Sequence, residues 1–510
     1  MLRPSLLLSL LVLLPAFLPA RAQQPVDVDP ALQLEIDRLI DADAFSHAFW
    51  GVHAVDMETG RTIYSRNASK NFVPASNVKL YTTAAALDQL GPFFRYETSL
   101  YVDGPVENGI LRGNLIVRGA ADPTFGGHYH AQSGTWDRNI DGLSPFRGWA
   151  DSLRAAGIRY VDGDIVGDDD VIDDEPLGAS WSWDDETYYY SAQIGGLSFH
   201  DNVIHLHVEG TDPGGPAAVR WEPFNTSYVD VVNRSLTVDQ EQTVEEGYRR
   251  VRGTNTIDVT SRVPVGGEDV EEITVENPTR YFVHVLRESL MRSGIAVAGK
   301  PIDVDDISIK PDYEGAHLRR IAVHRSPLLP DVAALVNKAS QNLYADNLIK
   351  TLAAHVPHDD DDLAPGSSER GIDIAMKTFV RAGIDTSRIR LVDGSGLSRL
   401  NLIAPNMTTS LLEYMWRHDD RLIREAFYAS LPLAAETGTL RYRLADGPAA
   451  GRMRGKSGSL SGVSTLSGYV ESAGGRTIAF SIACNHFTSP ASRVRAAQDA
   501  IVHALARYQP

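Results

Sequence analysis

Three short residue sets, spread over most of the chain, constrain the fold more than any other feature of the sequence. They are Ser76-Asn77-Val78-Lys79, Ser340-Gln341-Asn342 and Lys456-Ser457-Gly458. Two of the chain's eight lysines lie in these sets, which contain its only S-x-x-K and its only K-[ST]-G pattern. The middle pattern, S-x-N, is less specific because it also begins at Ser65 and Ser69. If the three sets form one site, the fold must bring three distant segments together.

The two ends of the chain carry matching patterns. Residues 48–56 and 62–66 predict two strands, and a helix is predicted from Ser76 to residue 90. Near the other end, residues 463–471 and 477–485 predict a hairpin, and a last helix follows Ser489-Pro490. The sequence therefore predicts an α+β fold in which one antiparallel sheet, built from both ends, is packed by helices.

The middle of the chain has a different pattern of predicted strands, turns and helices. Between about residues 100 and 325, short predicted strands (113–119, 164–167, 203–209 and 256–263) alternate with turns, and helices are predicted at 146–156 and 278–293. This length is typical of one or two additional domains. We therefore expect one domain made of residues 23–101 and 326–510, with a large mixed α/β insertion over residues 102–325.

The first 22 residues have the pattern of a cleaved export signal. Arg3 gives a basic start, residues 6–18 form an apolar run, and Ala20-Arg21-Ala22 is a small-residue cleavage site. An uncleaved anchor is the alternative, although the run is short for a membrane span. The single cysteine, Cys484, excludes an intramolecular disulfide, and its apolar surroundings in the sequence predict burial.

Composition and missing motifs exclude several function classes. The net charge of −18 argues against nucleic-acid partners. The chain contains no H-E-x-x-H, no G-x-S-x-G and no P-loop motif. Acidic clusters at 168–175 and 359–362 lack the spaced pattern of a calcium loop. His128-x-His130 and His205-x-His207 show no convergent ligand set, so we expect ordinary strand or loop residues and no metal.

The first motif suits a serine nucleophile. A serine hydroxyl needs a base within hydrogen-bond reach, and Lys79 lies one helical turn beyond Ser76 on the same face. A free lysine has a pKa of about 10.4, so burial and a neighbouring cation must lower it, and Lys456 is the expected cation. The alternative is a serine that caps a helix beside a solvated lysine.

The second motif falls between two predicted helices. On such a connection Ser340 could relay a proton to a leaving amine, and Asn342 could bond an amide of the substrate. A simple helix cap is the alternative.

The third motif is predicted on a strand at the edge of the sheet, where a peptide can add as a further strand. Ser457 would bind the carboxylate of the peptide, and Gly458 would allow close approach of the backbone. The backbone amides of Ser76 and Ser459 would form an oxyanion hole. The alternative is an ordinary Gly/Ser turn.

Together these motifs make the chain resemble the penicillin-binding protein 4 family, the D-alanyl-D-alanine carboxypeptidase/endopeptidases of peptidase family S13. The resemblance covers most of the mature chain, including the large insertion between the first two motifs. Besides the three motifs, it rests on Gly119-Ala120-Ala121-Asp122-Pro123, Trp181-Ser182-Trp183-Asp184-Asp185, Asp201-Asn202, Asp393-Gly394-Ser395-Gly396-Leu397-Ser398, Leu402-Ile403-Ala404-Pro405 and Gly438-Thr439-Leu440.

The resemblance implies a penicillin-recognising, serine transpeptidase-like domain and a periplasmic enzyme without a cofactor. It implies that peptidoglycan stem peptides acylate Ser76 and that β-lactams are covalent inhibitors. It also implies that Asp168 contacts an amino group at the diaminopimelate end of the substrate. Ser457 stands where threonine is more usual, and both residues supply a hydroxyl.

Two other functions stay open. One is a catalytically idle cell-wall binding or β-lactam sensor module, which would release no D-alanine. The other is a β-lactamase, disfavoured because no dedicated deacylating base is apparent and because the insertion suggests a larger substrate. Carboxypeptidase and endopeptidase activity would share one acyl-enzyme and differ in the leaving amine. The sequence indicates no oligomeric state.

Overall fold

The structure, a computed structural model, describes residues 29–358 and 362–510. The predicted export signal, residues 1–22, and most of the acidic run 359–362 lie outside the described residues. Among the helices of the described residues, none is both long enough and apolar enough to cross a membrane.

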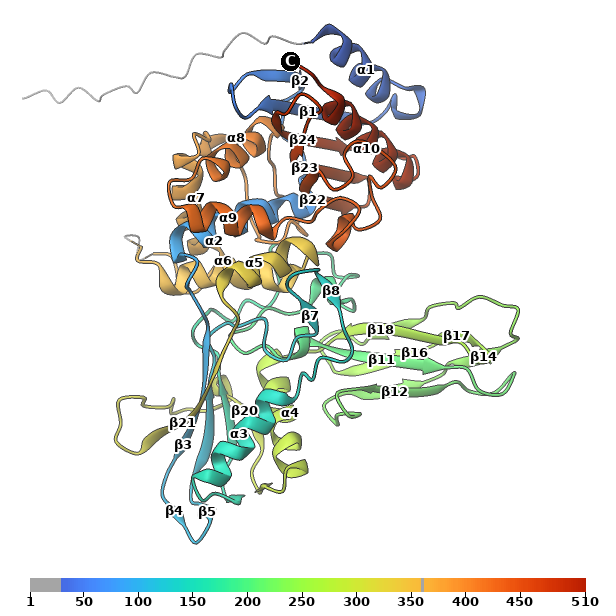
Figure 1. Cartoon of the computed structure of the whole chain (residues 1–510). Helices are drawn as coiled ribbons and strands as arrows, with labels where there is room; N and C mark the ends of the chain where they lie inside the picture. The colour runs from blue at the N-terminus through green and yellow to red at the C-terminus, as the bar shows by residue number, and fades with distance from the viewer. Residues whose placement is uncertain (1–28, 359–361) are drawn as a thin grey trace, which may run out of the picture.

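Both ends of the chain build one antiparallel sheet, as the sequence predicted (Figure 1). Its order is β2 (Thr62–Arg66), β1 (Phe49–Asp56), β24 (Thr477–Asn485), β23 (Val463–Glu471) and β22 (Met453–Leu460). The first and last parts of the sequence join where β1 pairs with β24, with Trp50 opposite Cys484. Cys484 is buried, as predicted.

Helices cover both faces of this sheet. Successive side chains of each strand point to opposite faces, and apolar side chains lie on both. On one face, Ile478, Phe480 and Ile482 share a core with α1 (Pro30–Ile40) and α10 (Ala491–Arg507). On the other, Tyr469 and Ala479 belong to a larger core formed mainly by helices. These helices are α2 (Val78–Leu90), α5 (Leu329–Lys338), α6 (Asn342–His355), α7 (Ser368–Arg381), α8 (Pro405–Trp416) and α9 (Arg421–Ser430).

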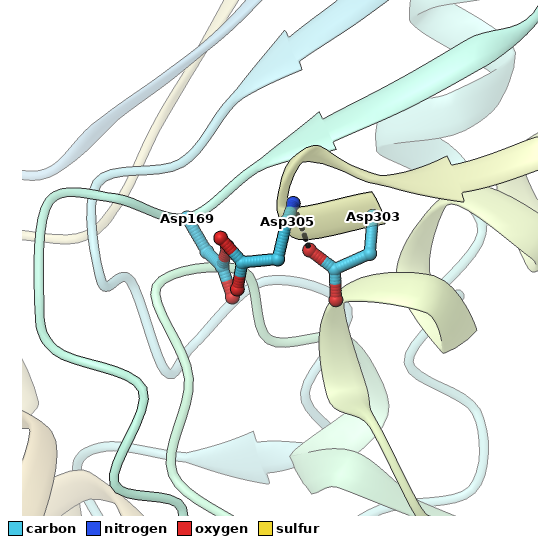
Figure 2. A group of neighbouring side chains, drawn as sticks. All are labelled: Asp169, Asp303 and Asp305. Atoms are coloured by element: carbon cyan, nitrogen blue, oxygen red, sulfur yellow. Dashed lines mark hydrogen bonds between the residues drawn. The ribbon is translucent and has the colours of Figure 1, made fainter. Parts of the chain in front are cut away.

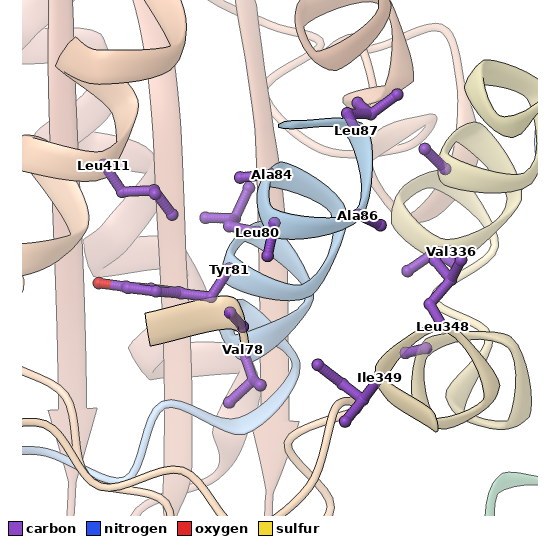
Figure 3. Packing of buried hydrophobic residues seen from close by; sticks show 14 of the residues in the cluster. Val78, Leu80, Tyr81, Ala84, Ala86, Leu87, Val336, Leu348, Ile349 and Leu411 are labelled. Atoms are coloured by element: carbon purple, nitrogen blue, oxygen red, sulfur yellow. The ribbon is translucent and has the colours of Figure 1, made fainter. Parts of the chain in front are cut away.

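Helix α2 lies at the centre of this larger core, where Val78, Leu80, Tyr81 and Leu87 pack among neighbouring helices (Figure 3). Every residue from 78 to 87 is buried, which is typical of a helix enclosed on all sides. The predicted start of this helix at Ser76 needs a correction. Ser76 lies in a 3₁₀ turn, Ala75–Asn77, where the Val78 N–H bonds back to the Ala75 carbonyl, and the α-helix begins only at Val78.

The inserted region leaves and returns through two paired strands, β3 (Glu97–Asp103) and β21 (Leu318–Arg325). They continue into a mixed sheet with β6 (Asn114–Arg118), β10 (Ile165–Asp168) and β20 (Pro301–Asp303). Helices α3 (Ser144–Ala155) and α4 (Pro278–Arg292) join its core. The structure thus confirms the predicted α+β class with a mixed α/β insertion.

A smaller antiparallel sheet extends sideways from the insertion (Figure 1). Its central strand is β11 (Val203–Glu209), between β12 (Ala218–Glu222) and β18 (Glu268–Thr274). The single strand predicted over residues 256–263 is two strands, β16 (Thr256–Val259) and β17 (Arg262–Pro264). The strand is divided there because its two parts join different sheets. β16 pairs with β13 (Asp230–Asn233) and β15 (Tyr248–Arg250), whereas β17 pairs with β14 (Leu236–Val238).

Candidate active site

The three motifs meet in one cleft of about 670 Å³. Ser76 enters it from the turn before α2, Ser340 and Asn342 from the junction of α5 and α6, and the third motif from β22. The residues that line the cleft are Ser76, Asp185, Tyr189, Tyr190, Ala339, Ser340, Asn342, Gly396, Leu397, Arg399, Thr439, Arg443, Ser457, Gly458, Ser459, Leu460, Ser461, Ser464 and Arg495.

Lys79 lies directly beneath Ser76. Its Nζ is 3.1 Å from Ser76 Oγ, and it donates hydrogen bonds to Asn342 Oδ1 at 2.6 Å and to the Ser395 carbonyl at 2.7 Å. The side chain is fully buried. The arrangement holds the lysine nitrogen within proton-transfer distance of the serine hydroxyl.

Burial lowers the pKa of Lys79 to about 8, as the first motif required, while Asp346 and Asp393 act in the opposite direction. Burial also lowers the pKa of Lys456, with a further contribution from the charge of Lys79. Burial, rather than the neighbouring cation that the sequence suggested, is the principal cause for Lys79.

Lys456 holds the second serine. Its Nζ donates to Ser340 Oγ at 2.9 Å and to the Ser457 carbonyl at 2.8 Å. Ser340 has φ +63, a left-handed conformation between α5 and α6. The cleft therefore contains two serine–lysine pairs, one from the first motif and one shared by the second and third motifs.

β22 is the edge strand of the sheet, as predicted, and it lies against the turn that carries Ser76. A Cβ on Gly458 would lie 2.9 Å from both Ser76 N and Pro74 O. On the other side, Gly396 has φ +85, and a Cβ there would lie 1.9 Å from Ala75 O. These two glycines let the backbone enclose Ser76 tightly.

Asp393 organises the loop that supplies the Ser395 carbonyl. Its Oδ1 accepts a hydrogen bond from Gly396 N at 2.8 Å, and its Oδ2 accepts from Ser398 N at 2.7 Å and Trp181 Nε1 at 3.0 Å. The sequence showed Trp181 and the run 393–398 only as parts of a resemblance. Their contact spans more than two hundred residues, so no local pattern predicts this role.

The charged groups of the cleft are Asp185, Arg399, Arg443 and Arg495. Asp185 Oδ1 accepts a hydrogen bond from Tyr190 OH at 3.0 Å. Asp168, by contrast, is not among the cleft-lining residues. It ends β10, is buried, and accepts a hydrogen bond from Tyr313 OH.

A second acidic group lies beside Asp168 in the insertion. Figure 2 shows the carboxylates of Asp169, Asp303 and Asp305 gathered together, with oxygens of all three within 4.8 Å of one another. Several of these oxygens already have partners in the chain: Asn277 Nδ2 donates to Asp303 at 2.8 Å, and Lys310 Nζ lies 3.4 Å from Asp305. We assign no ligand to this group.

Comparison with known proteins adds an independent finding. A model described as the D-Ala-D-Ala carboxypeptidase 3 (S13) family matches residues 32–508. The D-alanyl-D-alanine carboxypeptidase of Actinomadura sp. (strain R39) is 32% identical over 490 residues, covering 94% of this chain and 85% of that relative. The D-alanyl-D-alanine carboxypeptidase DacB of Haemophilus influenzae is 29% identical over 444 residues, covering 84% of each chain.

Among solved structures, penicillin binding protein 4 of Haemophilus influenzae shares the fold. The TM-score is 0.77 at 24% sequence identity, and the match covers 93% of this chain and 99% of that one.

Proposed function

The chain belongs to the D-Ala-D-Ala carboxypeptidase 3 (S13) family of serine peptidases, and we propose that Ser76 is its nucleophile and Lys79 its general base. The observation that carries the proposal is the 3.1 Å contact between Lys79 Nζ and Ser76 Oγ. A lysine whose pKa is lowered to about 8 is partly neutral near pH 7 and can accept the serine proton.

In the acylation step, Lys79 takes the proton of Ser76 while Oγ attacks the carbonyl carbon of the penultimate D-alanine. The backbone amides of Ser76 and Ser459 stabilise the negative charge on the carbonyl oxygen. Collapse of this intermediate breaks the peptide bond and releases the terminal amine. Ser340, held by Lys456, relays to that amine the proton that Lys79 took from Ser76, so that Lys79 is neutral again. A water molecule later hydrolyses the ester on Ser76.

The substrate is a peptidoglycan stem peptide that adds along the edge of β22, with its terminal carboxylate at Ser457 and Gly458. Arg399 and Arg495, which line the cleft, suit a carboxylate, whereas Arg443 is already paired with Asp499 at 2.5 Å. Asn342 holds an amide of the substrate. We propose that Asp185, which lines the cleft, meets an amino group of the substrate. The role that the resemblance implies for Asp168 stays a prediction.

When the substrate is a cross-linked peptide, formation of the same acyl-enzyme releases the amine of the cross-link, so endopeptidase activity is part of the proposal. β-Lactams would acylate Ser76 in the same way. We further propose export to the periplasm through residues 1–22 and a peptidase domain of residues 23–101 and 326–510 around an inserted region, 102–325. The paired strands β3 and β21, at the base of the insertion, support a division close to these bounds, with the first residues of β3 (Glu97–Asp103) joining the sheet of the insertion.

The test is incubation of the mature protein with a labelled penicillin and, separately, with purified muropeptides. We expect a covalent adduct on Ser76, release of D-alanine from pentapeptides, and neither with Ser76→Ala. An adduct without D-alanine release would favour a sensor module. Rapid turnover of the β-lactam without peptidase activity would favour a β-lactamase. Separation of the muropeptide products distinguishes carboxypeptidase from endopeptidase cleavage.

A further inference from the structure

Three buried histidines come together in the insertion, away from the cleft. His128 precedes β7 (Tyr129–His130), His200 lies in the turn before β11, and His205 lies within β11. Their ring centroids are 4.6 Å (128–200), 5.5 Å (128–205) and 4.4 Å (200–205) apart. Their exposed fractions are only 6%, 2% and 2%. The first of these residues is distant in sequence from the others, so the two H-x-H patterns gave no sign of this cluster.

The ring nitrogens of this cluster lack ordinary partners. Both nitrogens of His128 and both of His205 are buried without a hydrogen bond to the described residues. Burying polar groups without partners is unfavourable, which makes such groups rare unless something else binds them. His200 Nδ1 donates to the Val203 carbonyl at 3.1 Å, the kind of contact that orients the other nitrogen of a metal-binding imidazole.

Carboxylates flank the cluster on the same sheet. His205 on β11 lies opposite Glu272 of β18 on one side and opposite Glu222 of β12 on the other. Glu272 Oε1 lies 3.3 Å from His205 Nε2, without the alignment of a hydrogen bond.

The spacing of the rings suits a single metal ion. Zinc binds imidazole nitrogen at about 2.0–2.1 Å, which places it about 3 Å from the ring centre. The three centroid distances define a triangle whose corners are each about 3 Å from one common point. In this structure the three rings do not all direct a nitrogen to that point. Turning the His128 ring about its Cβ–Cγ bond breaks no hydrogen bond, because neither nitrogen has one.

We propose that His128, His200 and His205, with Glu272 as fourth ligand, bind a divalent transition metal ion of the zinc class. Three imidazoles and one carboxylate form a donor set typical of tetrahedral Zn²⁺. An entry route exists, since His128 and His200 line a cavity of about 310 Å³. None of these four residues lines the catalytic cleft, and the proposed acylation step requires no metal.

The metal ion would link the segment 126–142, which contains His128, to β11, which contains His205. The far side of that segment contacts the catalytic part of the chain: Lys338 Nζ donates to the Gln132 carbonyl at 2.8 Å, and Gly438 N donates to the Ser133 carbonyl at 2.9 Å. Lys338 ends α5, two residues before Ser340. The ion would therefore stabilise a segment that supports the second motif.

The test titrates tag-free, metal-stripped protein with Zn²⁺ in competition with a chromogenic chelator, and with Co²⁺ monitored by visible absorption. We expect one equivalent of Zn²⁺ bound, intense d–d bands of four-coordinate Co²⁺, and a melting temperature raised by Zn²⁺. His128→Gln and His205→Asn should each weaken binding at least tenfold. His130→Gln is the matched control, because His130 is exposed and bonds Asp137 outside the cluster.

A wild-type protein that binds no Zn²⁺ would overturn the proposal, and this result does not depend on any variant folding. Loss of binding in Asp303→Asn with retention in the histidine variants would move the ion to the carboxylates of Figure 2. Weak, six-coordinate Co²⁺ spectra would contradict the imidazole set. Circular dichroism of each variant separates lost ligands from lost fold, and His200→Gln provides a second variant if His205→Asn does not fold.

Discussion

Replacing Asp346 with asparagine should move the pH dependence of Ser76 acylation to lower pH. Asp346 is buried on α6, and its charge raises the pKa of Lys79 against the larger effect of burial, which lowers it to about 8. Asparagine has the same shape and keeps the oxygen that accepts a hydrogen bond from Gly394 N at 2.6 Å. The substitution therefore removes charge while preserving the local structure.

The sign follows from the base that acylation needs. Only neutral Lys79 can take the serine proton, so the rate rises as pH rises through the pKa of the lysine. Removing a nearby negative charge makes the ammonium form less stable and lowers that pKa. A close charge shifts a pKa by about 1 to 3 units. Because burial raises the pKa of Asp346 itself to about 7, its charge is incomplete near neutrality, and the lower end is expected.

A shift of about one unit would raise the neutral fraction of Lys79 at pH 7 from about one tenth to about one half. Stopped-flow acylation by a chromogenic cephalosporin, from about pH 6 to pH 10, would locate the rising limb. The plateau at high pH should fall somewhat, because a lysine of lower pKa is a weaker base. Asp151→Asn, at an exposed position on α3, is the control.

A limb that stays in place in a stable Asp346→Asn variant would show that the base does not sense this carboxylate. A rising part of the pH–rate profile that moves to higher pH would contradict the assignment of Lys79 as the base, because loss of a nearby negative charge lowers the pKa of the lysine.

Three further substitutions test the geometry of the site. In Gly458→Ala, the new Cβ would lie 2.3 Å from Thr465 Oγ1 and 2.9 Å from Ser76 N, so penicillin acylation should fall about 100-fold and the melting temperature should also fall. Trp181→Phe removes the 3.0 Å hydrogen bond to Asp393, which should lower the free energy of unfolding, measured in urea, by about 2 kcal/mol. Ser457→Thr keeps the hydroxyl that bonds Thr439 at 3.0 Å, so D-alanine release should stay within about threefold of wild type, measured as kcat/KM. Three results would contradict these contacts: a Ser457→Thr variant that releases no D-alanine, a Gly458→Ala variant acylated at the wild-type rate, or a Trp181→Phe variant with an unchanged free energy of unfolding.

The sheet was predictable because its patterns are local. Alternating apolar residues and a glycine-containing turn define β23 and β24, and the predicted and observed hairpins have the same bounds. The edge position predicted for the strand that carries the third motif, β22, is confirmed. The motif residues could be found because their chemistry restricts which residue types occupy those positions.

Other features depend on contacts between distant segments and left no periodic signal. The hydrogen bond from Trp181 to Asp393 joins a loop of the insertion to a loop of the peptidase part. His200 has φ +56, within three consecutive left-handed residues that place it beside His205. Left-handed conformations in non-glycine residues are maintained by the surrounding structure, so sequence propensity does not predict them.

The surroundings of Lys79 determine when the enzyme can become active during folding. Ser76 and Lys79 are neighbours along the chain from the start, but the burial that lowers the lysine pKa depends on α6 and the loop at Asp393. In an unfolded chain Lys79 is an ordinary ammonium group and Ser76 an unreactive hydroxyl. Pairing of segments so far apart in sequence is a slow step of folding. The reactive serine therefore arises late, only after α6 and the loop at Asp393 have packed against Lys79.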